Sequence, residues 1–362
     1  MVGGRLPDRV PGSLCLIIIY RAYSHTGNRA TKVAQMTAVS PPRTEPVPAI
    51  VAESEITANL RQHAEAARGA FASNTERALR ADVVIFTGWC AGEGRQTLPA
   101  SADTVAAFID AMAASKAPAT VRRYVSSVAT FHRAAAVANP CEAQVVKLAL
   151  KRMHRERGLA QAQAAPLNDV LVARMLAAAG STLRDLRNKA LLTVAYTTLC
   201  CRSELVALQR ADLESESDGF GTVTIRRSKT DQEGAGEVAP ITPDAMRHVK
   251  AWIDAAGIEG DALFRGVLKG GRVAGALDAG DVARIFKAMA GKAGLTAEET
   301  ARISEHSTRI GASQDMVRYG AELPAIMQAG RWTTPVMVAR YTRRLTARRS
   351  AAVQIADRRA QF

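Results

Sequence analysis

Apolar side chains recur every three to four residues through much of the chain, and this spacing predicts amphipathic α-helices. In the first half, a helix is expected behind the capping-box sequence Ser-Asn-Thr-Glu at 73–76, ending at Gly92 and Gly94. A second helix is expected to begin at Ser101. A third is expected over 119–136, with Pro118 at its start, and a fourth over 141–157. His63 and His132 are expected on helix surfaces.

The second half combines helical spacing with one stretch of strict alternation. β-Branched residues alternate through 221–226, which predicts a strand, and 236–239 is expected to pair with it across a turn at 228–231. Helices are expected over residues 168–179, 182–199, 243–256, 280–293, 307–319, 322–329 and 334–345. The expected fold is mainly α with a small β-hairpin or sheet.

The chain divides into segments of different composition. Residues 1–49 are rich in proline toward their end and predict an unstructured tail, with Met36 as an alternative start. Small, uncharged residues followed by Pro166 predict a linker over 158–166 between a helical domain at 50–157 and a second domain at 167–362. The basic segment 347–359 ends the chain and carries a small apolar patch at Val353 and Ile355.

The charge balance is strongly basic. Lys and Arg total 48 against 34 Asp and Glu, a formal net charge of +14 at pH 7. This excess favours a polyanionic partner, although charge that only keeps the protein in solution is the alternative. Because no stretch reaches the ~18 apolar residues of a spanning helix and none is basic and amphipathic, nucleic acid is expected rather than a membrane.

The cysteines indicate the compartment. The chain has five, at positions 15, 90, 141, 200 and 201, without a Cys-x-x-Cys pair. Such a scattered, odd-numbered set argues against a disulfide framework or a zinc site and favours a reducing, cytoplasmic environment. No metal or other cofactor is expected.

Basic side chains concentrate on the helices predicted before the linker. Six of them are the candidates for phosphate contacts with DNA: Arg122, Arg123, Lys147, Lys151, Arg152 and Arg155. The alternative for any one of them is an ordinary solvated helix face.

The residues best suited to catalysis lie near the C-terminal end. His306 precedes Arg309 by three positions, which places both side chains on one helix face. Trp332 follows in the turn Gly330-Arg331-Trp332, and Tyr341 is flanked by the cations Arg340, Arg343 and Arg344. A tyrosine among cations has a more accessible phenolate and attracts phosphate, as a nucleophile that attacks phosphorus requires.

The run from His306 to Arg344, HSTRIGASQDMVRYGAELPAIMQAGRWTTPVMVARYTRR, closely resembles the active-site segment of the tyrosine site-specific recombinases. The resemblance extends more loosely over residues 50–362. It implies a helical, SAM-like core-binding domain and an α+β catalytic domain that close on duplex DNA as a clamp. It also implies inverted half-sites bound by a dimer, a tetramer in synapsis, and a C-terminal helix that packs on a neighbouring protomer.

The resemblance also implies roles for individual residues. Tyr341 would attack phosphorus and form a 3′-phosphotyrosyl link, while Arg309 and Trp332 would bind the phosphate oxygens. His306 would take or share the tyrosine proton, and Lys229 would protonate the 5′-oxygen. Neither metal nor ATP is expected, and the sequence has no Gly-x-x-x-x-Gly-Lys loop or paired carboxylates at metal spacing.

One position departs from the family pattern. The family places an arginine three residues before the glutamate that corresponds to Glu204, and here that position is Cys201. Arg202 is one residue late, and one residue turns a helical side chain by about 100°. Either Arg202 reaches the phosphate, or the chain binds DNA and cleaves it poorly. A relaxing enzyme resembling a topoisomerase, with the same chemistry on single duplexes, is a third possibility.

Overall fold

A computed structural model describes residues 48–158, 163–226, 236–347 and 351–359, and the chain forms two compact units, Met1–Gln161 and Ala162–Phe362. Three expectations from the sequence fall wholly or largely outside the described residues. They are the tail at 1–49, the central part of the linker and the turn that carries Lys229. No helix among the described residues is long and apolar enough to cross a membrane.

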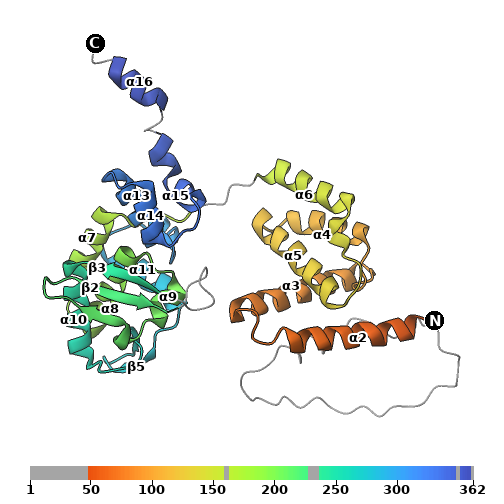
Figure 1. Cartoon of the computed structure of the whole chain (residues 1–362), viewed down its shortest axis with the longest axis horizontal. Coiled ribbons are helices and arrows are strands. Elements are labelled where there is room, and N and C mark those ends of the chain that lie inside the picture. The colour runs from red at the N-terminus through yellow and green to blue at the C-terminus, as the bar shows by residue number, and fades with distance from the viewer. Residues whose placement is uncertain (1–47, 159–162, 227–235, 348–350, 360–362) are drawn as a thin grey trace, which may run out of the picture. The chain divides into compact units, whose positions relative to one another are not determined.

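The first unit is helical (Figure 1). Its elements are α2 (Pro48–Ala66), α3 (Ser73–Gly92), α4 (Ala102–Ala113), α5 (Pro118–Ala134), the 3₁₀ turn η1 (Pro140–Glu142) and α6 (Gln144–Arg157). Aromatic rings form its centre: Phe108 lies 5.1 Å from Phe86 and 6.0 Å from Tyr124 between ring centroids. The apolar spacing in the sequence therefore predicted the faces that pack together.

Three local predictions in this unit were wrong. Helix α3 begins at Ser73 with the extended Ala72 as its N-cap, so Ser73 does not occupy the N-cap position that the predicted capping box requires. The fourth helix begins at Gln144 because Asn139 and Pro140 start a separate 3₁₀ turn before it. His132 is fully buried instead of exposed, since Nε2 accepts a hydrogen bond from the Ala100 amide and Nδ1 bonds the Val128 carbonyl.

The second unit surrounds a small antiparallel sheet with helices. Its strands are β1 (Leu213–Ser215), β2 (Gly221–Ile225) and β3 (Glu237–Ile241) in the order β1-β2-β3, and a separate pair, β4 (Arg265–Val267) and β5 (Val273–Ala276). Its helices are α7 (Asp169–Ala178), α8 (Leu183–Thr198), α9 (Arg202–Ala207), α10 (Pro243–Ala256), α11 (Asp281–Lys292), α12 (Ala297–Ala301), α13 (Ser307–Arg318), α14 (Leu323–Gly330), α15 (Val336–Ala347) and α16 (Ala351–Arg359), with a 3₁₀ turn η2 (Arg210–Asp212). The expected fold class, mainly α with small antiparallel sheets, is confirmed.

The core of this unit is formed by the sheet together with helices α7, α8, α10 and α11, which Figure 1 labels. Trp252 of α10 is fully buried and donates its indole N–H to the Leu263 carbonyl at 2.9 Å. Helix α8 is buried along most of its length. Its C-terminal end, which leads to Leu199 and Cys201, is thereby fixed in place.

Helix α13 is held close to the start of the unit. The Leu167 amide donates to the Ser307 carbonyl at 2.9 Å. A side chain at Gly311 would place its Cβ 1.9 Å from the Leu167 carbonyl oxygen, so only glycine permits this approach. This close contact positions the first turn of α13, which carries His306 and Arg309.

Candidate active site

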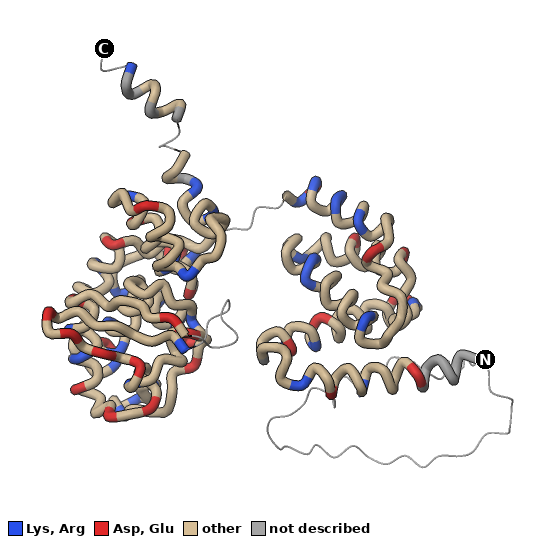
Figure 2. The backbone as a smooth tube through the Cα atoms, viewed as in Figure 1, with Lys and Arg blue, Asp and Glu red and all other residues tan. Residues whose placement is uncertain are grey.

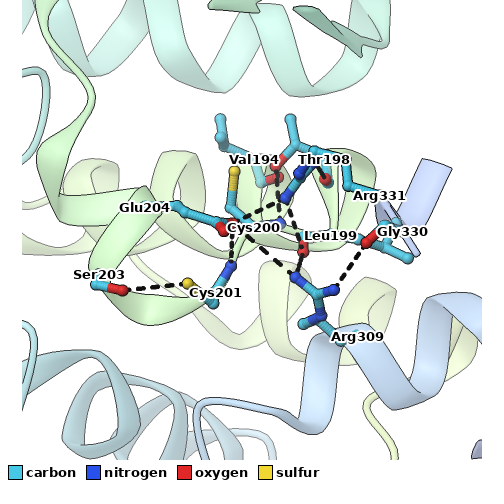
Figure 3. A network of polar contacts seen from close by, with 10 residues as sticks. All are labelled: Val194, Thr198, Leu199, Cys200, Cys201, Ser203, Glu204, Arg309, Gly330 and Arg331. Atoms are coloured by element: carbon cyan, nitrogen blue, oxygen red, sulfur yellow. Dashed lines mark hydrogen bonds and ion pairs between the residues drawn. The ribbon is translucent and has the colours of Figure 1, made fainter. Parts of the chain in front are cut away.

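Arg309 is the centre of a polar network between α8, α9, α13 and the end of α14 (Figure 3). Its guanidinium donates to the Leu199 carbonyl at 2.5 Å and to the Gly330 carbonyl at 2.9 Å. Its Nη1 also lies 3.9 Å from Oε2 of Glu204. The buried Arg309 side chain is therefore held in one orientation by two carbonyls and a carboxylate.

Two aromatic residues extend this network. The Arg309 guanidinium lies 5.2 Å from the centre of the Trp332 ring, and that ring lies 5.7 Å from the ring of Tyr341 in an edge-to-face arrangement. Gln314 of α13 donates to the Tyr341 carbonyl at 2.9 Å. Helices α13 and α15 thus bring the proposed nucleophile beside the cation–π pair.

Gly330 allows this arrangement of rings. A Cβ at this position would lie 2.4 Å from Cε3 of Trp332, closer than van der Waals contact with the indole ring permits. Trp332 therefore packs directly over the backbone at the end of α14.

His306 lies at the start of the helix that carries Arg309. It is the exposed N-cap residue of α13; its amide donates to Ser304 Oγ at 3.1 Å and its carbonyl accepts from the Ile310 amide. His306 and Arg309 therefore lie about one turn apart at the start of α13. Lys229 lies outside the described residues.

Cys201 and Arg202 begin α9 in different surroundings. Cys201 is the N-cap; its amide donates to Glu204 Oε2 at 2.8 Å, and its Sγ lies 3.2 Å from Ser203 Oγ. Arg202 extends to Glu305, with Nη1 3.1 Å from Oε1, and its side chain is 48% exposed. Arg202, whose approach to the phosphate was one of the two alternatives, is therefore paired with the residue before His306.

Arg331 is a further site residue that the sequence analysis did not recognise. Its side chain is only 4% exposed, and its Nη2 lies 2.8 Å from Glu204 Oε2. Nη1 donates to the Thr198 carbonyl at 2.9 Å. The only indication in the sequence is the position of Arg331 just after helix α14, where a left-handed residue is common. The direction of its side chain depends on a φ of 53°, which the sequence does not specify.

Comparison with known proteins places this arrangement in a family. Residues 167–348, which contain the whole network, match the model of the phage integrase family. The chain belongs to the phage integrase family. The resemblance of the sequence to tyrosine recombinases is thereby confirmed.

Curated relatives of this integrase-family chain cover most of its length. The chain is 28% identical over 307 residues to the recombinase Cre of Escherichia phage P1, across 80% of this chain and 90% of Cre. It is 31% identical over 281 residues to an integrase/recombinase XerD homolog of Selenomonas ruminantium, across 75% of this chain and 81% of the homolog.

Solved structures share the fold at lower identity. XerH site-specific recombinase in a pre-cleavage complex with difH substrate has a TM-score of 0.53 and 16% identity, with 84% of this chain and 90% of XerH covered. A lambda integrase dimer bound to a COC′ core site has a TM-score of 0.54 and 14% identity, with 83% of this chain and 81% of that chain covered.

The six basic residues predicted to contact DNA fall into two groups. Arg123 pairs with the buried Asp82 at 2.9 Å, and Arg152 pairs with Asp110 at 2.7 Å. The others are exposed: Arg122, and the residues Lys147, Lys151 and Arg155, whose four-residue intervals place them on one face of α6. We call these last three the α6 basic stripe. Figure 2 shows basic positions recurring along this helix.

Proposed function

We propose that this chain is a site-specific DNA recombinase that cleaves and rejoins DNA through a 3′-phosphotyrosyl intermediate, without metal or ATP. The observation that carries the proposal is the continuous contact from Glu204 through Arg309 and Trp332 to Tyr341. These four residues come from α9, α13, the end of α14 and α15, and they meet in one place.

The proposed cleavage step is a transesterification. The Tyr341 oxygen forms a bond to phosphorus as the bond from phosphorus to the 5′-oxygen breaks. The tyrosine proton passes to His306, and Lys229 supplies a proton to the leaving oxygen. Because the energy of the broken ester is kept in the phosphotyrosyl ester, reversal of the step with another 5′-hydroxyl rejoins the DNA.

Arg309 and Trp332 would stabilise the charge that develops on the non-bridging oxygens. Arg309 is already oriented by two carbonyls, so it needs little rearrangement when phosphate arrives. Trp332 would donate its indole N–H to the phosphate while its ring keeps Tyr341 in place. Preorganised donors of this kind typically contribute about 10²–10³ in rate each.

The proposed substrate is duplex DNA with inverted half-sites, bound by a dimer and paired by a tetramer. Both structural relatives described above are recombinases in complex with DNA. The α6 basic stripe supplies cations for the phosphate backbone, and α16, with Val353 and Ile355 exposed, is the proposed contact with a neighbouring protomer. The proposed location is the cytoplasm.

A cleavage-impaired DNA-binding protein is the second candidate function. The observation in its favour is that Cys201 contributes no positive charge and that Arg202 forms an ion pair with Glu305. On this alternative, the chain would bind its site and block it. A relaxing enzyme that acts on single duplexes would instead cleave without synapsis of two sites.

The test is covalent capture. Nicked duplexes made from the DNA that flanks the gene trap a phosphotyrosyl product, because the short cleaved fragment diffuses away. We expect a protein–DNA adduct on a denaturing gel, absent with Tyr341→Phe, and a retarded complex on a native gel with both proteins. A retarded complex without any adduct would favour the DNA-binding alternative.

A further inference from the structure

Glu204 is a buried carboxylate that two arginines approach from different parts of the chain. Its side chain is 7% exposed, and its Oε2 lies 2.8 Å from Arg331 and 3.9 Å from Arg309 (Figure 3). A buried carboxylate is costly unless a cation and hydrogen bonds compensate its charge. Arg331 provides the shorter ion pair.

The charge balance of this network has a direct consequence for Arg309. Glu204 contributes one negative charge, while Arg331 and Arg309 contribute two positive charges. Because Arg331 pairs with the carboxylate, the positive charge of Arg309 is left to interact with an incoming phosphate. Without Arg331, Arg309 would form the ion pair with Glu204 itself, and the carboxylate would then neutralise the positive charge of Arg309.

The backbone at Arg331 supports a specific role for this side chain. Arg331 follows α14 with φ 53° and ψ 45°, a left-handed conformation that glycine adopts without cost and that a long side chain does not favour. Here that conformation folds the guanidinium back onto the carbonyls of Thr198 and Leu199. A strained backbone that presents a buried charge beside a reaction site is typical of functional positions.

We propose that Arg331 is a positioning residue of the cleavage site, which supplies the positive charge that Cys201 lacks. This inference rests on the proposed recombinase function. Arg331 binds the carboxylate of Glu204 and the carbonyl at Leu199, two of the three groups that orient Arg309. It thereby keeps Arg309 directed at the scissile phosphate in a site that has no arginine at position 201.

The test compares cleavage rates on two nicked substrates, one with a normal scissile phosphate and one with a methylphosphonate. Arg331→Met removes the charge but keeps the length of the side chain. On phosphate we expect adduct formation to slow by about 10²–10³. On methylphosphonate, which carries no negative charge, we expect a loss below about tenfold. Arg331→Lys should recover part of the rate on phosphate.

Second variants separate a charge effect from misfolding. Glu204→Gln combined with Arg331→Met removes both members of the buried pair, so Glu204 is not left as a buried carboxylate without its cation. Cys201→Arg combined with Arg331→Met restores a cation from the α9 side and should cleave faster than Arg331→Met alone. A purely structural role for Arg331 predicts equal losses on the two substrates and no recovery from Cys201→Arg, and that result would overturn the inference.

Adduct formation by the unmodified protein and by Cys201→Arg distinguishes a failure of this inference from a failure of the proposed function. If it forms no adduct while Cys201→Arg forms one that is lost in Tyr341→Phe, Arg331 does not replace the missing arginine and the inference is wrong. If neither protein forms an adduct on any of the flanking duplexes, the recombinase function itself is wrong. An adduct with the unmodified protein at the same rate as Arg331→Met also contradicts the inference.

Discussion

The indole of Trp332 packs on a glycine, and this contact makes a sharp prediction at the scale of single residues. In Gly330→Ala the added Cβ would lie 2.4 Å from the ring, so Trp332 must move away from Arg309 and Tyr341. Misplacement of a catalytic group by about 1 Å can cost roughly 10²-fold in rate. We expect single-turnover adduct formation to fall by about this factor while DNA affinity stays within twofold.

Gly291→Ala is the matched control for this substitution. Gly291 lies in α11, and no atom lies within 4 Å of a Cβ at that position. The control should cleave at the unmodified rate. Equal rates for Gly330→Ala and Gly291→Ala would show that the position of Trp332 does not limit cleavage.

The buried His132 predicts a pH dependence of stability in the first unit. Burial lowers the pKa of His132, and the neutral ring is required because Nε2 accepts a hydrogen bond. The unfolded chain, with a His pKa near 6.5, therefore binds the proton more readily than the folded chain. The stabilising contribution is complete above pH ~6.5 and decreases as the pH falls toward the folded pKa.

Hydrogen exchange of the α5 peptides measures this effect in the full-length protein. After correction for intrinsic exchange, protection should decrease between about pH 7.5 and 5.5 in the unmodified protein. His132→Gln, which does not titrate, should be less protected at pH 7.5 but lose little more at pH 5.5. A parallel decrease in both proteins would assign the pH dependence to another group.

At the candidate site, the proximity of residues could be predicted from sequence when one short segment carried them, whereas their catalytic roles stay predictions. Arg309, Trp332 and Tyr341 lie within 33 residues of one another, and their contacts follow from the short helices between them. Arg331 could not be assigned, because its partner Glu204 is 127 residues away and its direction depends on one backbone angle. Whether Arg202 reached the phosphate was equally open, since Glu305 is distant in sequence.

At the scale of elements, long helices with clear apolar spacing were predicted well and short elements were not. The predicted helix at 243–256 coincides with α10, Pro243–Ala256, because Pro243 and the left-handed Gly257 define its ends. Helix α9 has six residues and β4 only three, so tertiary packing determines them more than their own sequence does. The predicted N-cap of α3 was wrong by one residue, because the helix already begins at Ser73 and Ala72 precedes it as the N-cap.

The backbone at Leu167 passes close to Gly311 of α13, and this contact gives a prediction at the scale of elements. In Gly311→Ala a Cβ would lie 1.9 Å from a backbone oxygen, which cannot rotate away as a side chain can. The two segments must separate, and overpacking of this kind costs roughly 3 kcal/mol of unfolding free energy. Urea unfolding followed by circular dichroism should show a lower midpoint for the second unit, with Gly291→Ala as control. An unchanged midpoint would mean that α13 and Leu167 are not tightly packed.

The whole chain divides between Gln161 and Ala162, inside the stretch of small residues at 158–166. The end of that stretch is not a free connection, however, because the Ala165 amide donates to the Arg302 carbonyl at 2.9 Å. Composition could indicate a break in the chain but not this hydrogen bond. Likewise, the net charge of +14 indicated a polyanionic partner without distinguishing paired from unpaired cations.

The difference between cations that have an ion-pair partner and cations that do not gives a prediction for DNA binding by the whole protein. Each phosphate contact contributes about 0.9 to the slope of log affinity against log salt, so loss of the three α6 basic stripe residues should reduce the slope by about 2.7. The triple Lys147→Gln, Lys151→Gln, Arg155→Gln variant tests this by fluorescence anisotropy on a labelled duplex between about 50 and 200 mM salt. Arg152→Gln is the matched control, because Asp110 already neutralises Arg152 at 2.7 Å, and its slope should change by less than about 0.9. If the control reduces the slope as much as one stripe residue does on average, the ion pair opens on DNA and Arg152 belongs to the binding surface.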